Sequence, residues 1–242
     1  YDKEVDTATA AHNEEEDGLQ SSSNVSLVYK PNRQFTNKFI AGKTLVKRVY
    51  APTPLSGNTK KDNYTGDRYA LMYSGNYNFN LDNSVVFGLE REDDTIHYVK
   101  DEAAKQIRDA YITSSYFDFQ SRVTQNIYAT FGSRFDEHSK AGNEDSHRAT
   151  LAYLFDDKTT KIKSSYGTGF RFPSLYEMYY ADGYGAASYG LQKAENSKSF
   201  DIGIEKSFSN LGLSIDASYF NVQYHDALEG WKQTGWVTQN QP

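Results

Sequence analysis

The chain has 242 residues, a net charge of −6 and 15% aromatic residues, but a hydrophobic fraction of only 38%. The acidic balance argues against a nucleic-acid partner, because phosphate binding needs a basic face. The absence of cysteine excludes disulfides and thiolate metal sites, and no run of about 18 apolar residues predicts a transmembrane helix. Many aromatic residues beside few aliphatic ones are typical of a barrel that turns apolar side chains toward lipid.

Hydrophobic and polar residues alternate along most of the chain, which is the period of a β-strand with two unlike faces. In residues 211–219, Leu211, Leu213 and Ile215 alternate with Ser214 and Asp216. This pattern predicts an all-β, antiparallel fold. Eleven strands are expected, at residues 21–30, 34–50, 66–79, 83–92, 108–119, 122–134, 145–155, 159–170, 198–208, 211–219 and 231–238.

The connections between these strands alternate between two kinds. Short turns are expected at residues 31–33, 80–82, 120–121, 156–158 and 209–210, and longer polar loops at residues 1–20, 51–65, 93–107, 136–144 and 171–197, with a brief last connection near 225–230. In an antiparallel meander this order places all short turns on one rim and all long loops on the other. Up-and-down outer-membrane barrels have that asymmetry, which is not expected of a sandwich or a propeller.

The same alternation predicts which way the side chains face. In the barrel hypothesis the apolar members face lipid and the polar members face the lumen. The expected outward set is Val123, Ile127, Phe131, Leu211, Leu213 and Ile215, and the expected inward set is Asn126, Thr130, Ser214 and Asp216.

Two segments late in the chain carry the most specific signal. The first, Tyr166–Tyr179, reads YGTGFRFPSLYEMY, and the second, at 193–203, contains KAENS followed by FDIG. Together they resemble the paired motifs of TonB-dependent outer-membrane receptors. The sequence departs from those motifs at Phe172, Gln192 and Ala194, where the family usually has Ala, Leu and Pro.

This resemblance implies a transmembrane up-and-down β-barrel of roughly 22 strands around a plug domain. Residues 1–242 would then be a partial barrel domain of about 11 strands, without the plug. The implied location is the outer membrane of a Gram-negative bacterium, in contact with its lipid and lipopolysaccharide. The implied task is TonB-energised uptake of a scarce nutrient, with TonB acting through the plug.

The sequence contains none of the common catalytic motifs, such as GxSxG, HExxH, a P-loop or CxxC. We therefore expect a receptor, not an enzyme, and no required cofactor. An alternative of another class is a soluble carbohydrate-binding β-protein. In that case a second sheet would cover the apolar rows that the barrel exposes to lipid.

The loop at 171–197 is the first candidate binding segment. Its tyrosines are interleaved with glycines, a mixture typical of adaptable binding surfaces. Tyr180, Tyr184 and Tyr189 are the expected substrate contacts, whereas Tyr176, next to the strand, is expected in rim packing. Arg171 at the strand tip is expected to pair either with the luminal wall or with the plug.

The acidic segment at 1–20 is the second candidate. Within the family, the start of the chain and the placement of the loops look most like vitamin B12 receptors, which bind calcium in acidic outer loops. This resemblance implies cobalamin as the substrate and Ca²⁺ on Asp2 and Asp17, since calcium takes oxygen ligands in flexible acidic loops. A ferric-siderophore or haem receptor is the alternative within the family. Haem is disfavoured because residues 171–197 contain no histidine.

Overall fold

The computed structural model describes residues 14–52, 61–99, 104–179, 193–229 and 239–241. Ten strands form one antiparallel sheet, in which each strand pairs with its neighbours along the chain. These strands are β1 (Glu14–Tyr29), β2 (Phe35–Pro52), β3 (Asp62–Asn78), β4 (Asn83–Val99), β5 (Gln106–Arg122), β6 (Ile127–His138), β7 (Gly142–Leu154), β8 (Thr160–Arg171), β9 (Glu195–Phe208) and β10 (Leu213–His225). A short helix, α1 (Leu175–Tyr179), follows β8, and a small separate sheet joins β11 (Ala227–Glu229) to β12 (Gln239–Gln241).

The antiparallel all-β meander predicted from the sequence is confirmed, with ten strands in the main sheet. The eleventh predicted strand, at 231–238, lies outside the described residues. Several strands run further than predicted: β1 starts at Glu14, inside the expected loop 1–20, and the expected loop 136–144 shrinks to residues 139–141. Both faces of these strand ends are polar, so hydrophobic alternation does not mark them.

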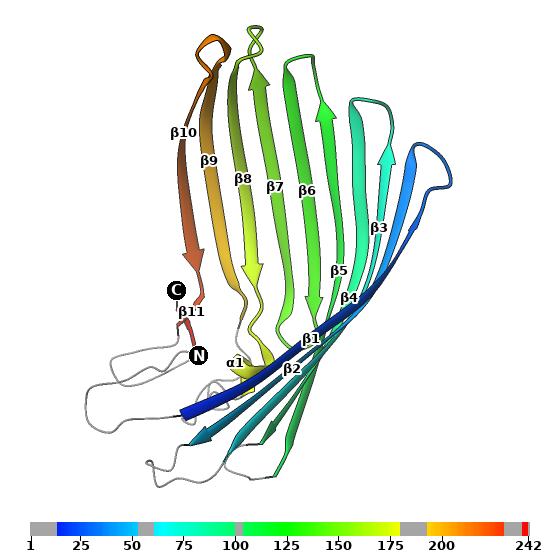
Figure 1. The fold of residues 1–242 in the computed structure, drawn as a ribbon, viewed down its shortest axis with the longest axis vertical. Helices are drawn as coiled ribbons and strands as arrows, with labels where there is room; N and C mark the ends of the chain where they lie inside the picture. The colour runs from blue at the N-terminus through cyan, green and yellow to red at the C-terminus, as the bar shows by residue number, and fades with distance from the viewer. Residues whose placement is uncertain (1–13, 53–60, 100–103, 180–192, 230–238, 242) are drawn as a thin grey trace, which may run out of the picture.

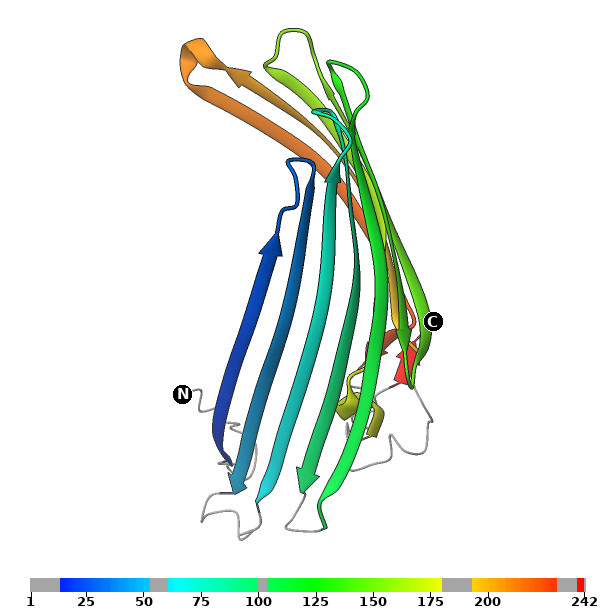
Figure 2. The ribbon, with the colours of Figure 1, turned by 90° about the vertical axis from the view of Figure 1, so that its right-hand side faces the viewer.

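The sheet curls into an open trough (Figures 1 and 2), and β1 and β10 do not pair with each other. One rim, at the top of Figure 1, carries the turns that follow β1, β3, β5, β7 and β9. We call this rim the turn end. The opposite rim, the loop end, carries α1, which lies inside the concave face of the trough. The described residues contain no helix long and apolar enough to span a membrane.

Side-chain oxygens close four of the tight connections at the turn end. In each, the side-chain oxygen accepts a hydrogen bond from the backbone N–H two residues later, as polar turn residues commonly do. It accepts a second hydrogen bond from the residue after that, either from the backbone N–H or, at Asn80, from the side-chain amide. The four residues are Asn32, Asn80, Thr124 and Asp157. The fifth connection is a 3₁₀ turn, Ser209–Leu211, which ends at Gly212 with φ of 61°.

The convex face of the trough is apolar and carries a band of aromatic rings near the turn end. The Phe35 ring lies 6.1 Å from Tyr77 and 6.3 Å from Phe87, and Phe79 lies 6.3 Å from Phe119. Further along the strands the same face exposes aliphatic and aromatic side chains: Leu71, Leu89, Phe131, Leu151, Ile204 and Ile215. An outward apolar face with an aromatic border is typical of a barrel wall in contact with lipid.

Strand register confirms most of the predicted facing. Ile127, Phe131, Leu213 and Ile215 share the convex face, whereas Thr130, Ser214 and Asp216 share the concave face. Strand register does not test the prediction for three residues, because they lie outside the strands. Val123 and Asn126 belong to the β5–β6 turn, and Leu211 to the 3₁₀ turn, because β5 runs on to Arg122 and β10 starts only at Leu213.

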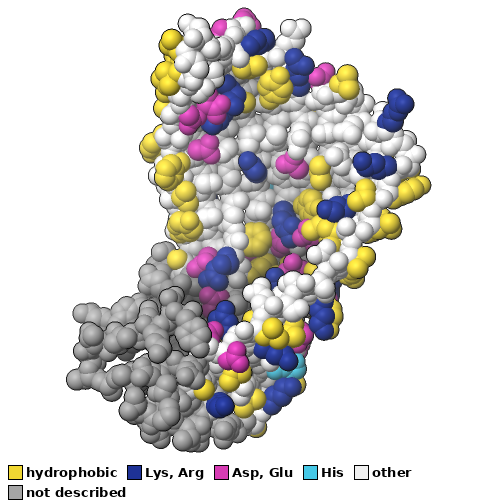
Figure 3. Space-filling view, viewed as in Figure 1, with side chains coloured by type: hydrophobic (Ala, Val, Ile, Leu, Met, Phe, Trp, Pro, Cys, Tyr) yellow, Lys and Arg dark blue, Asp and Glu magenta, His cyan; other side chains and the backbone are white. Residues whose placement is uncertain are grey.

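The concave face is lined by charged and polar side chains (Figure 3). Towards the turn end, Glu205 forms ion pairs with Lys161 and Lys163. The Lys163 Nζ also lies 3.3 Å from Asp216 Oδ2. A polar concave wall opposite an apolar convex wall is the arrangement of a barrel that encloses water or a polar plug.

Candidate functional site

The sequence-predicted site residues fall on different parts of the molecule. Asp2, Tyr180, Tyr184 and Tyr189 lie outside the described residues. Asp17 lies within β1, not in a loop, and the register with Val49 places it on the convex face. No group of three or more His, Asp or Glu side chains within the described residues is arranged to hold a metal ion.

A different cluster forms around Arg171, the last residue of β8. Its Nε donates to Glu195 Oε2 at 2.6 Å, and its two Nη atoms donate to the carboxylate of Glu177 at 2.9 and 3.0 Å. We call Arg171, Glu177 and Glu195 the clamp. A guanidinium that binds one carboxylate bidentately and a second through Nε makes strong, geometrically defined hydrogen bonds. The clamp ties the end of β8, helix α1 and the start of β9 together.

Helix α1 begins with a capping box. Glu177 N–H donates to Ser174 Oγ at 3.2 Å, and Glu177 Oε2 accepts the Ser174 N–H at 2.7 Å. Burial alone would raise the pKa of Glu177, but the hydrogen bonds from Arg171 and Ser174 outweigh it, and the pKa lies below its ordinary value. Glu177 therefore both caps the helix and completes the clamp.

Helix α1 carries one of the few buried apolar side chains, and the two strands that it contacts carry two others. The buried apolar residues of the described chain include Tyr98, Ala110, Met178 and Ala194, and Met178 is 2% exposed. Helix α1 contacts β4 and β5, although more than 50 residues separate it from either strand in the sequence. The wall of the trough is therefore packed on its concave side mainly where α1 rests on it.

Tyrosine rings continue this packing across neighbouring strands. Tyr64 on β3 lies 4.5 Å from Tyr98 on β4 in a stacked arrangement, 5.6 Å from Tyr50 on β2 and 5.8 Å from Tyr176 on α1. Beside them, the Arg108 guanidinium lies 5.2 Å from the ring of Tyr179. We call these five tyrosines, with Arg108, the tyrosine wall.

The chemistry of the tyrosine wall suits a ligand with aromatic and anionic groups. Tyrosine presents a large face at low entropic cost, with a hydroxyl for hydrogen bonding. Arginine adds positive charge and stacks on aromatic groups. A second guanidinium, that of Arg48, lies on the same face of β2 as Tyr50 and pairs with Glu16 at 3.7 Å.

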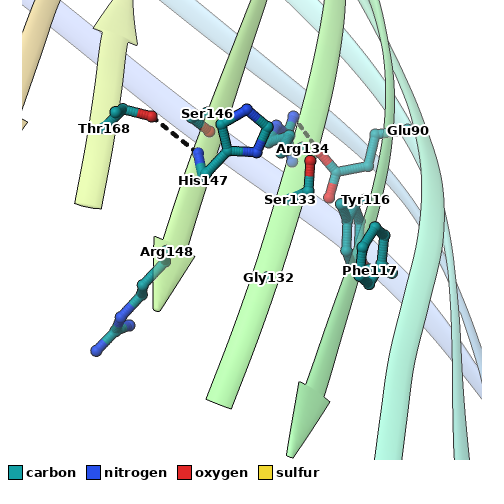
Figure 4. A pocket seen from close by; sticks show the side chains of 10 residues that line it. All are labelled: Glu90, Tyr116, Phe117, Gly132, Ser133, Arg134, Ser146, His147, Arg148 and Thr168. Atoms are coloured by element: carbon teal, nitrogen blue, oxygen red, sulfur yellow. Dashed lines mark hydrogen bonds and ion pairs between the residues drawn. The ribbon is translucent and has the colours of Figure 1, made fainter. Parts of the chain in front are cut away.

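A second polar cluster lies on the concave face nearer the middle of the strands. Arg134 pairs with Glu90 at 2.7 Å and with Asp136 at 2.8 Å, and its Nη2 donates to Ser114 Oγ at 2.8 Å. Asp136 and Ser114 are each 3% exposed. Arg134 and Glu90 line a hollow of about 370 Å³ with Arg148 and other residues of β4–β8 (Figure 4).

The hollow lies where β8 separates from β7. The ladder between these strands ends at Arg148 and Gly167, and the next N–H, that of His147, donates to Thr168 Oγ1 at 2.9 Å (Figure 4). Beyond this point the chain turns inward, so that Phe172 contacts His138 at 4.9 Å between ring centroids. This inward turn brings α1 onto the concave face.

Sequence reasoning identified the motif around Arg171 but missed most of the tyrosine wall. It left open whether Arg171 pairs with the wall or with a plug, and the structure shows it paired with Glu177 and Glu195. Tyr64 and Tyr98 were missed because they lie at strand ends that were predicted as loops, and Tyr50, at the end of a predicted strand, carried no signal of its own. Tyr176, expected in rim packing, does pack against the wall.

The fold and this wall define the class: an antiparallel barrel wall with an apolar outside and a polar inside. A family model described as "TonB dependent receptor-like, beta-barrel" matches residues 1–230. The chain therefore belongs to the TonB-dependent receptor β-barrel family, whose members are outer-membrane transport receptors of Gram-negative bacteria, not enzymes. No curated protein sequence matches the chain.

Solved structures support the same fold. The ferric enterobactin receptor of Pseudomonas aeruginosa matches 88% of this chain and 36% of its own length, with TM-score 0.75 and 15% identity. The siderophore receptor PirA of Acinetobacter baumannii matches 88% and 35%, with TM-score 0.67 and 17% identity. The copper transporter OprC matches 88% and 40%, with TM-score 0.70 and 13% identity. The chain thus spans less than half the length of these proteins.

Proposed function

We propose that this chain forms part of an outer-membrane receptor for TonB-energised uptake of a scarce nutrient, and that the nutrient is an anionic iron chelate with aromatic groups. The tyrosine wall at the loop end of the concave face carries this proposal, since its stacked rings and arginines match such a ligand. The loop end would face the outside of the cell, because outer-membrane barrels carry their longer loops there. The names of two structural relatives, a ferric enterobactin receptor and a siderophore receptor, support the same substrate class.

Cobalamin is the second candidate substrate, on the sequence resemblance to vitamin B12 receptors. The two ligands would need different contacts in the site. An iron chelate would present its aromatic rings and negative charge to the tyrosines and arginines. A plug domain and TonB would act as partners of the full-length receptor, and lipid and lipopolysaccharide would surround its convex face.

Direct binding to the full-length receptor in detergent decides between the two substrates. We expect a ferric catecholate siderophore to bind and cobalamin not to bind in isothermal titration calorimetry. Tyr64→Ala should weaken binding about tenfold, the loss of roughly one ring-stacking contact. Tyr128→Ala is the matched control, because Tyr128 lies on the same face at the turn end, beside Arg122. Equal affinity of both variants, or binding of cobalamin alone, would contradict the proposed substrate class.

Tyr180, Tyr184 and Tyr189 remain a separate hypothesis for the connection between α1 and β9. Replacing all three with alanine should weaken substrate binding while the barrel still folds. An unchanged affinity would limit ligand contact to the tyrosine wall.

A further inference from the structure

The clamp has no part in the ligand chemistry proposed above, although its three residues come from the two most specific sequence segments. Arg171 and Glu177 belong to the first segment, and Glu195 to the second. The guanidinium of Arg171 contacts both carboxylates at 2.6–3.0 Å. One cation therefore joins both ends of the connection between β8 and β9.

Helix α1 needs such an anchor. It has five residues, and an isolated helix shorter than about 12 residues is unstable in water. Its position across the trough depends on the capping box, the burial of Met178 and the clamp. The clamp links α1 to β8, from which the chain departs, and to β9, to which it returns.

We propose that Arg171 is a positioning residue, which through Glu177 and Glu195 holds α1 on the concave wall and so keeps Tyr176 and Tyr179 in the tyrosine wall. Loss of the guanidinium leaves two carboxylates facing each other without a cation. Their repulsion then favours dissociation of α1 from the concave wall. Lysine keeps the charge but not the forked geometry that reaches both carboxylates. The consequence for ligand binding rests on the proposed function, but the docking of α1 does not.

The docking of α1 can be measured without a ligand, because the described chain has no cysteine and Met178 is 2% exposed. In the full-length receptor, with any other cysteines replaced, Met178→Cys provides a thiol that a maleimide reaches only when α1 lifts off. We expect Arg171→Gln in this background to accelerate labelling on the order of tenfold or more, the factor expected for losing hydrogen bonds to charged groups.

Three further variants make this test specific. Lys206→Gln removes another cation, which contacts Asp157 at the turn end, and should leave the labelling rate unchanged. The exchange of charges in Arg171→Glu/Glu195→Arg leaves the capping box of Glu177 and Ser174 in place and should slow labelling part of the way back, since the guanidinium again lies between two carboxylates. Ala110→Cys, at a residue 5% exposed on the concave face of β5, one of the two strands that α1 contacts, gives a second reporter in case Met178→Cys itself loosens α1.

Equal labelling rates with and without Arg171, at both reporters, would overturn the proposal, and so would a charge exchange that brings no recovery. The ligand measurement then separates this proposal from the proposed function. Accelerated labelling with weaker binding of the iron chelate supports both. Accelerated labelling with unchanged binding supports the positioning role and overturns the tyrosine wall as the binding surface.

Discussion

Gly88 and Gly66 both lie on the concave face, but only Gly66 has open space in front of it. A Cβ added at Gly88 would lie 2.5 Å from the ring of Tyr116 and 2.5 Å from the backbone oxygen of Tyr73, whereas one added at Gly66 meets nothing within 4 Å. Tyr116 therefore rests directly on the backbone of β4. At this position glycine is required by close approach, not by backbone conformation.

We therefore expect Gly88→Ala to destabilise the barrel by about 1–3 kcal/mol, the usual cost of overpacking. Gly66→Ala should change stability by less than about 1 kcal/mol. Urea unfolding of the two variants of the full-length receptor in lipid vesicles measures the difference. If both variants lose the same stability, the close packing of Tyr116 over β4 is not the reason why glycine is required at position 88.

Glu177 predicts a pH dependence of α1 docking. Its pKa is lowered from 4.5, because hydrogen bonds from Arg171 and Ser174 exceed the effect of burial. A carboxylate with a lowered pKa stabilises the folded state fully above its unfolded pKa, and this contribution is lost as the pH falls through the folded value. Docking of α1 should therefore be constant above pH 4.5 and weaken at lower pH.

Methionine methyl NMR can follow this change. The chain has two methionines, Met72 and Met178, so Met72 on β3 is an internal reference in the same spectrum. We expect the Met178 methyl signal to shift below pH 4.5 and the Glu177→Gln variant to show the shifted signal at neutral pH. A Met178 signal that stays constant to pH 3 would show that Glu177 does not control docking.

At the scale of single elements, β6 separates the two environments most clearly. Its convex side chains include Ile127, near the turn end, and Phe131, whose ring lies 5.8 Å from that of Phe117 on the same apolar face. Its concave side chains include Thr130, which hydrogen-bonds Thr150 at 2.6 Å. The strand therefore alternates between lipid and a polar interior within a few residues.

Arginine substitutions along β6 should follow this alternation. We expect Phe131→Arg to cost about 2–4 kcal/mol if it lies near the bilayer midplane, and Ile127→Arg, nearer the interface, to cost less. Thr130→Arg, directed to the concave side, should cost about 1 kcal/mol or less. Unfolding from lipid vesicles gives all three values. Equal costs at 130 and 131 would place a second sheet, not lipid, against the convex face.

At the scale of the whole receptor, calcium remains a prediction. The acidic segment before β2 contains Asp2, which lies outside the described residues, and Asp17, which lies on β1. If the substrate is cobalamin, Ca²⁺ should increase its affinity, because carboxylates that repel one another are drawn together by the cation. Calorimetric titration of cobalamin with Ca²⁺ and with a chelator tests this. Affinity that is the same in both conditions, or that survives Asp2→Ala and Asp17→Ala, would exclude a role for calcium.

The sequence by itself determined the strand order, the faces of the strands and the family, because alternation and turn residues act between close neighbours in the chain. It placed Ile127 and Leu213 outside and Thr130 and Asp216 inside. It misjudged the ends of β1, β6 and β7, where both faces are polar and alternation is lost. Only the tertiary structure decided which strand ends meet.

The tyrosine wall shows most clearly what the sequence by itself does not determine. Tyr50, Tyr64 and Tyr98 become neighbours through strand register, and Tyr176 joins them because β8 turns inward and the clamp holds α1 there. Neither register nor the direction of that turn is encoded in periodicity. Both depend on hydrogen bonds and ion pairs between residues far apart in the chain, so only the folded sheet brings the candidate site together.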